Sequence, residues 1–392
     1  MQSTNIDLSK KRGCNTGHIF LPVLIICLMI LPGSLFAQDE GDVDITGAYL
    51  GLFNILDQEN SEDYSPSRNQ FDLAANINFN WQIRENILGV FQLQGSPGEG
   101  SFGFPGSEVE ITDLNVEFSF DDYDSKLTVG SFDTPFGMQT ASLSNNGNSF
   151  GNPLLLNSLF YCAFAGAPMG TLNTVGAMGN YNHEYFDATL AFSNGTNESA
   201  DNSDGGFEIS GTAVGKIPVS EGELDFAFSY INSDDRSESG SNGTESDFSG
   251  FLAEGMFAPI EGAHVKGYYG MISYDDNDSD TDDDVNIWMA EGRYGREGWH
   301  LGVRISGWMP ENDDGNGIGI SEAIPNPGLA VQINGAIPYT DQKITRIQAG
   351  GGYMIVEDLI IKAELFLDNY DQSTLGDATD VQGVILGLNG RF

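Results

Sequence analysis

Positively charged residues are scarce in this chain, and long hydrophobic runs are lacking beyond its first 37 residues. Lys and Arg number 16 against 57 Asp and Glu, so the formal net charge of the 392 residues is −41. This acidity argues against nucleic acid as a partner and against anionic lipid surfaces, because both repel a negatively charged protein. After residue 37, no apolar segment reaches the roughly 20 residues that a membrane-spanning helix needs.

Cysteine is also rare, and two of the three cysteines lie in a segment with the features of a secretory leader. Basic residues at 10–12 precede an apolar run at 19–31, and the small residue Ala37 follows. The run is too short to span a bilayer, so residues 1–37 are predicted to be a cleaved signal peptide and not a membrane anchor. The remainder, 38–392, keeps only Cys162, which excludes an internal disulfide bond.

Apolar and polar residues alternate in many short segments of 38–392. In 71–81, one face is apolar from Phe71 to Trp81, whereas the other carries Asp72 and a row of asparagines. Such segments are typical of membrane β-barrels, although a β-sandwich also alternates. We predict strands at 42–56, 69–82, 86–95, 108–120, 124–133, 171–182, 184–193, 206–216, 222–231, 248–258, 263–274, 285–295, 298–309, 343–355, 358–368 and 380–392.

The predicted connections alternate between short turns and long loops, which a sandwich has no reason to do. Short turns such as His183 and Arg296-Glu297 follow every second strand, and long loops follow the others. Both termini then lie on the side of the short turns, as in barrels of the bacterial outer membrane. We therefore predict an all-β fold for 38–392: a transmembrane antiparallel up-and-down β-barrel of about 16 strands.

Acidic residues concentrate in the predicted long loops, and the densest run is 275–284. Its carboxylates could hold Ca²⁺ or Mg²⁺ loosely and bridge to lipopolysaccharide, but a merely solvated acidic surface is an equal interpretation. We expect no other metal site and no cofactor. The candidate ligands are Asp275, Asp276, Asp278, Asp280, Asp282, Asp283 and Asp284.

Residues 134–183 contain no Asp, Glu, Lys or Arg. Their first part, 134–170, is the longest predicted loop and holds the apolar runs 153–156 and 159–165. An external loop would not normally expose so much apolar surface, so we expect it to fold inward and narrow the lumen. The alternative is a contact between protomers of a trimer. The candidate constriction residues are Phe136, Asn145, Asn148, Asn157 and Tyr161.

The last predicted strand runs to the final residue, Phe392, and places its apolar residues on one face. Soluble domains usually fray at their ends, whereas a strand that must close a barrel does not. This ending resembles the C-terminal signal by which outer-membrane barrels are recognised for assembly, so Phe392 is predicted to be that signal.

Residues 127–137, from Leu127 to the sequence Pro135-Phe136-Gly137, are similar to a strand motif of the phosphate-selective porin family and related porins. The resemblance implies a bacterial outer-membrane porin, in which the third external loop narrows the pore; the loop 134–170 is the third here. It does not extend to phosphate specificity. That property needs a ladder of bases, whereas alternation places acids and bases together on the polar face, including Asp113, Glu117, Lys126 and Arg304 as candidate pore-lining residues.

These observations favour a porin in the outer membrane of a Gram-negative bacterium, a passive diffusion channel for small hydrophilic solutes that prefers cations or neutral molecules. The expected partners are outer-membrane lipids, lipopolysaccharide and the barrel-assembly machinery, with a homotrimer as a family expectation. Three alternatives remain: a plugged barrel acting as an adhesin or structural protein, a secreted acidic β-protein, and a membrane hydrolase. The hydrolase rests on the sequence Gly147-Asn148-Ser149-Phe150-Gly151, which lacks the strand–turn–helix context of a nucleophile elbow, so we expect no enzyme.

Deleting Phe392 should impair insertion into the outer membrane more than it alters the pore of the molecules that do insert. The fraction with heat-modifiable gel mobility measures assembly, and single-channel conductance measures the pore. Normal assembly after the deletion would remove the argument from the C-terminal strand.

Overall fold

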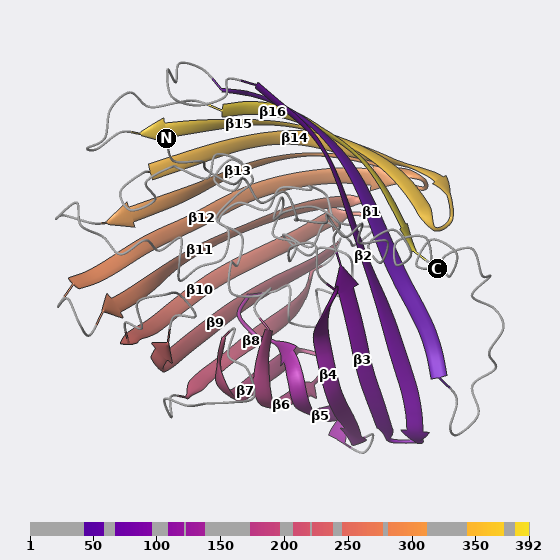
Figure 1. The fold of residues 1–392 in the computed structure, drawn as a ribbon, viewed down its shortest axis with the longest axis vertical. Helices are drawn as coiled ribbons and strands as arrows, with labels where there is room; N and C mark the ends of the chain where they lie inside the picture. Colours follow the sequence, from indigo (N-terminus) through magenta and orange to yellow (C-terminus); the bar gives the residue numbers. More distant parts are fainter. Residues whose placement is uncertain are drawn as a thin grey trace, which may run out of the picture.

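The computed structural model is a closed β-barrel of sixteen antiparallel strands (Figure 1). It describes residues 43–58, 67–95, 109–120, 123–137, 173–196, 207–219, 222–237, 245–276, 281–311, 343–371 and 381–391. The strands are β1 (Val43–Gln58), β2 (Ser67–Arg84), β3 (Ile87–Gly95), β4 (Val109–Phe120), β5 (Ser125–Asp133), β6 (Asn173–Asn182), β7 (Phe186–Thr196), β8 (Glu208–Val219), β9 (Gly222–Ser237), β10 (Glu245–Ile260), β11 (Ala263–Asp276), β12 (Thr281–Arg296), β13 (Trp299–Glu311), β14 (Lys343–Val356), β15 (Leu359–Asp371) and β16 (Val381–Arg391).

Each strand pairs with its neighbours in the sequence, and β1 pairs with β16 to close the ring. The closing register runs from Ala48 opposite Arg391 to Gln58 opposite Val381. Closure leaves no sheet edge with unpaired backbone groups, which is the condition for a β-structure in a bilayer. The predicted up-and-down barrel of about 16 strands is therefore confirmed, and each predicted range overlaps one observed strand.

The strands extend further than predicted at the ends that carry the acidic residues. The predicted loop 275–284 is mostly strand, because β11 continues to Asp276 and β12 starts at Thr281. Asp275 lies opposite Asp282 in this ladder, and Tyr274 lies opposite Asp283. The predicted strand ends were wrong here, because they were placed where the alternation of apolar residues stops. The backbone ladder continues beyond that point, since pairing between strands does not require an apolar outer face.

Exposed apolar side chains cover one face of the strands, and buried side chains, many of them polar, cover the other. On β9, Leu224, Phe226, Phe228 and Tyr230 are exposed, and the side chains between them are buried. In a closed barrel, the first set forms the outer face and the second the inner wall. Across the described residues, no helix is long and apolar enough to cross a membrane.

Glycines on the outer face leave room for aromatic rings from the neighbouring strand. At the closing seam, Gly390 lies directly opposite Tyr49, and a Cβ added to Gly390 would lie 2.2 Å from Tyr49 Cζ. Gly215 is covered in the same way by the opposite Phe226, whose Cζ would be 2.3 Å from the added Cβ. An aromatic ring over a glycine fixes the register of two strands, because neither partner tolerates a shift.

Gly390→Ala should push a methyl group into the Tyr49 ring and lower the free energy of unfolding by about 1–3 kcal/mol, the usual cost of overpacking. Urea-induced unfolding in lipid vesicles measures this change, and adding Tyr49→Ala should recover part of it. Gly292→Ala is the matched control, because no atom lies within 4 Å of the added Cβ at that position. Equal stability of the two single variants would contradict the role of the seam.

Candidate functional site: the inner wall

Among the side chains that the structure describes, two parts of the inner wall carry opposite charge, one on β7–β10 and one on β11–β15. The buried inward-facing acids of β7–β10 are Asp187, Glu208, Asp225 and Glu254, and Lys216 is the base among them. On β11–β15, bases outnumber the described acids Glu291 and Glu364. These bases are Lys266, Arg293, Arg304, Arg346 and Lys362.

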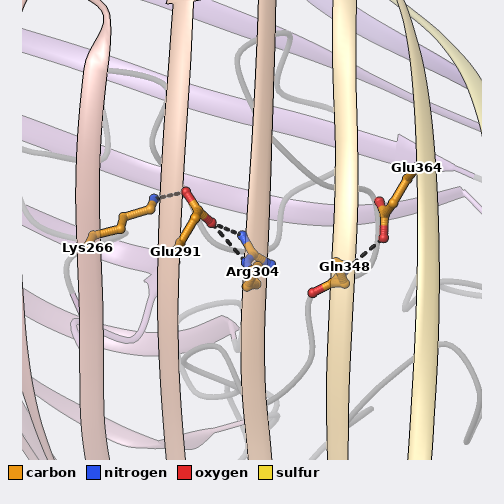
Figure 2. Close-up of polar contacts among 5 residues, drawn as sticks. All are labelled: Lys266, Glu291, Arg304, Gln348 and Glu364. Carbon is orange, nitrogen blue, oxygen red and sulfur yellow. Dashed lines mark hydrogen bonds and ion pairs between the residues drawn. The ribbon is translucent and has the colours of Figure 1, made fainter.

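One carboxylate joins three strands of the basic part, as Figure 2 shows. Glu291 on β12 lies opposite Lys266 on β11 and opposite Arg304 on β13. Its Oε1 is 3.5 Å from Lys266 Nζ, and its Oε2 accepts hydrogen bonds from Arg304 Nε at 2.8 Å and Nη2 at 2.6 Å. All three side chains are buried, and such charges are tolerated because each has a partner of opposite sign.

The polar contacts continue around the wall on β14 and β15. Gln348 Nε2 donates a hydrogen bond of 2.8 Å to Glu364 Oε1 (Figure 2). The Arg346 guanidinium lies over the Phe366 ring, with its Cζ 5.1 Å from the ring centre, in a cation–π arrangement. Basic side chains here are thus placed by neighbours on adjacent strands and do not hang freely in the lumen.

Separate ion pairs occur elsewhere on the inner wall. Lys216 Nζ is 2.6 Å from Asp187 Oδ2, which joins β8 to β7. Lys126 Nζ is 2.8 Å from Glu117 Oε1, which joins β5 to β4, and this pair is partly exposed. Because exposed pairs contribute little to stability, the Lys126–Glu117 pair matters more for the charge of the lumen than for the fold.

The chain after β5 turns onto the inner wall of β8–β10. Thr134 Oγ1 donates to Glu208 Oε1 at 3.3 Å, and Gly137 N donates to Ser229 Oγ at 3.0 Å. Phe136, between them in sequence, is fully buried. Gly137 has φ 94°, a value that side chains rarely allow, so the glycine permits the turn.

A ring of hydrogen bonds holds this segment. Thr212 Oγ1 donates to the Pro135 carbonyl at 3.0 Å and lies 2.8 Å from Ser229 Oγ, directly across the β8–β9 ladder. Since the single hydroxyl proton of Thr212 goes to Pro135, Ser229 must donate to Thr212 while it accepts from Gly137. We call this arrangement the Thr212–Ser229 clamp.

The structure describes part of the predicted site. Glu117 and Lys126 form an ion pair, but Arg304 lies on β13, halfway round the ring of strands from β5. The backbone of Asp113 lies opposite Gln92 in the β3–β4 ladder, and its side chain is outside the described set. Phe136 lies in the segment that the clamp holds, and its side chain is buried. Asn145, Asn148, Asn157, Tyr161 and Phe392 lie outside the described residues, as do the rest of the loop 134–170 and the signal peptide 1–37.

The predicted cation site is described only in part. Asp278 and Asp280 lie outside the described residues, and of the other five, Asp275, Asp276, Asp282, Asp283 and Asp284, only the Asp284 side chain is described. Asp284 accepts a hydrogen bond from Ser273. Within the described part of the chain, no three potential ligands gather to hold a metal ion. Loose cation binding by this run stays a prediction.

Sequence reasoning missed Glu291, Arg346 and Glu208. Arg346 lies two residues before Gln348 on β14, and Glu208 lies two residues before Ser210 on β8. Simple alternation would therefore have assigned both charged residues to the inner wall. Glu291 gave no such signal, because its face of β12 also carries apolar residues such as Met289 and the opposite face carries Trp288.

Comparison with known proteins agrees with this architecture. No family model and no curated protein matches the chain. Solved structures do match: a loop L8 deletion mutant of OmpT, an outer membrane protein of Vibrio cholerae, has 14% identity and a TM-score of 0.59 over 90% of this chain and 100% of that one. An anion-selective porin from Comamonas acidovorans has 12% identity and a TM-score of 0.59, over 90% of this chain and 100% of that one.

The outer membrane channel DcaP of Acinetobacter baumannii is also similar, with 13% identity and a TM-score of 0.57 over 92% of this chain and 100% of that one. The chain therefore has the fold of outer-membrane porins. At these identities the likeness extends to the fold alone. The resemblance to the phosphate-selective family stays a prediction.

Ser229→Ala should remove the acceptor of the Gly137 amide and the donor to Thr212. Leaving buried polar groups unpaired costs about 1–3 kcal/mol, so we expect lower stability and faster hydrogen exchange at the Gly137 amide. Mass spectrometry of exchange in detergent measures the second effect. Ser306→Ala is the matched control: Ser306 is also buried on the inner wall, but its hydroxyl has no hydrogen-bond partner among the described residues. Similar effects of the two changes would contradict the clamp.

Proposed function

We propose that this chain is a passive diffusion channel for small hydrophilic solutes in the outer membrane of a Gram-negative bacterium. One observation carries the proposal: a closed barrel combines an apolar outer face with an inner wall of charged and hydroxyl-bearing side chains. Lipid favours the first surface, and a polar permeating solute favours the second. Barrels of 16–18 strands are wide enough to leave an aqueous channel.

The size limit belongs to the same proposal. The loop 134–170 would narrow the lumen, and the position of Thr134–Gly137 supports this, because these residues contact inward-facing side chains of β8 and β9. Buried hydrogen bonds at the base of a loop restrict where the rest of it can go. Phe136 would then be the first side chain of the constriction.

A preference for cations or neutral solutes is the finer part of the proposal. The net charge of −41 and the aspartates at the facing ends of β11 and β12 would concentrate cations at that mouth. The bases of β11–β15 act in the opposite direction, so the preference should be modest.

We further propose that the chain is not an enzyme, and that it contacts lipopolysaccharide and the barrel-assembly machinery. A homotrimer is proposed from the fold: one similar structure, OmpT of Vibrio cholerae, is described in a trimer form, with 12% identity to this chain. Cross-linking in native membranes would show whether this chain also assembles in threes.

Stepwise increases of conductance are expected when the purified chain is added to a planar bilayer, because each inserted barrel opens one aqueous path. The same amount of heat-denatured chain is the control. A plugged barrel that serves as an adhesin or structural protein would insert without such steps, so the measurement separates the two functions.

Reversal potentials across a KCl gradient should show a modest preference for K⁺ over Cl⁻. Replacing Asp275 and Asp282 by Asn should reduce it, because the charge at the mouth becomes less negative. A clear preference for Cl⁻ in the unaltered chain would show that the inner bases, and not the acidic mouth, set the selectivity.

A further inference from the structure

Side chains with amide or hydroxyl groups lie together on the inner wall of β1–β4. Asn78 on β2 lies opposite Thr46 on β1 and opposite Gln92 on β3. These side chains face inward, because the exposed apolar residues Ile45 and Trp81 hold the alternate positions on β1 and β2. We call this set the amide face, and its members are Thr46, Asn78, Asn80, Gln92 and Asn115.

The amide face is more accessible from the lumen than the charged parts of the wall. All of its members except Asn115 are partly exposed. By contrast, Glu208 on the acidic part and Arg346 and Gln348 on the basic part are each 0% exposed. A solute inside the barrel therefore meets the amide face, whereas those three side chains are out of its reach.

Acidic positions border the amide face. Asp44 on β1 lies opposite Asn80, and the backbone of Asp113 on β4 lies opposite Gln92. Acids at these positions disfavour an anionic solute, because they repel it. A carboxylate also accepts hydrogen bonds from hydroxyl groups. The surroundings thus favour a solute that carries hydroxyl groups and no negative charge.

The chemistry of the amide face matches a row of hydroxyl groups. A side-chain amide both donates and accepts hydrogen bonds, as a hydroxyl group does. Neighbouring strands lie about 4.8 Å apart, so side chains on adjacent strands can bind several hydroxyls of one solute together. Asn78 Oδ1 has no hydrogen-bond partner among the described residues, and the soft terminal torsion of asparagine lets this amide turn toward a bound hydroxyl.

An apolar position lies within the amide face. Val90 on β3 lies opposite Asn80 on one side and opposite Asn115 on the other, and it is partly exposed. Its methyl groups offer a contact for the C–H groups of a solute, between amides that bind its hydroxyls. A sugar ring combines C–H groups and hydroxyls in this way.

We propose that the amide face binds an uncharged, polyhydroxylated solute, a carbohydrate, as it passes through the barrel. Asn78, Asn80 and Gln92 exchange hydrogen bonds with its hydroxyls, and Val90 contacts its C–H groups. The inference rests on the proposed channel function and specifies the class of solute.

The test uses the full chain in planar bilayers in KCl, with glucose added. Glucose should lower the single-channel conductance by more than it lowers the conductivity of the bulk solution, and this extra effect should saturate as the site fills. Diglycine, a small zwitterion, and choline, a cation, are the comparison solutes. Neither should produce a saturating effect.

Changes of single asparagines test the site itself. Asn80→Leu should raise the half-saturating concentration of glucose about 2- to 10-fold, the effect of one neutral hydrogen bond. Asn80→Ser, which keeps a group that donates and accepts, should retain more of the binding. Asn86→Leu is the matched control and should change nothing, because Asn86 is an exposed residue in the turn between β2 and β3. If Asn80→Leu does not assemble, Gln92→Leu decides the result.

A conducting barrel on which glucose has no saturating effect, or on which diglycine or choline acts equally, would overturn the inference and leave the channel function intact. Equal shifts for Asn80→Leu and Asn86→Leu would also overturn it. If no stepwise openings occur, the channel function fails. Saturation-transfer NMR of glucose, with the chain in a detergent that has no sugar headgroup, then decides the site by itself. A transfer signal that Asn80→Leu weakens and Asn86→Leu does not would support the site, and no signal would exclude it.

Discussion

Closure of the backbone hydrogen-bond ring is the constraint on which the rest of this structure depends. Every strand must find a partner on both sides, and the last partner for β16 is β1, at the opposite end of the chain. The contact of Tyr49 with Gly390 lies in this closing ladder. Once the register of the seam is set, every residue is assigned to the outer face or the inner wall, because a shift of one residue would exchange the two faces of a strand.

That assignment explains why so many charged residues are buried. An interior of this kind holds ion pairs between adjacent strands, such as Lys216 with Asp187 and Glu291 with Arg304. Each pair offsets a desolvation cost that either charge alone would impose, so such pairs are not a large net source of stability. Their effect is to fix which charge lies where on the wall. The result is an acidic part on β7–β10 and a basic part on β11–β15.

The fold could be predicted from the sequence because its main signal is local. Alternation with period two identifies each strand, and the alternating short turns and long loops delimit it. In an up-and-down barrel, the order of the strands in the sheet is their order in the sequence. The site could be predicted only in part. Alternation assigns Lys126 and Glu117 to the inward face, and the structure joins them in an ion pair. A strand such as β12, with Trp288 and Met289 on opposite faces, gives no such signal for Glu291. The Thr212–Ser229 clamp could not be predicted from the sequence, because no local pattern links Thr212 to Pro135, which lies 77 residues earlier.

The clamp also bears on the order in which the barrel can assemble. Gly137 is bound by Ser229, which follows it by 92 residues, so the segment after β5 has no wall to bind until β8 and β9 have paired. Contacts between such distant residues form late and slow folding. The ring is completed by the pairing of β16 with β1. If the ring closes first, the segment can reach the inner wall only through an end of the barrel or through a broken ladder.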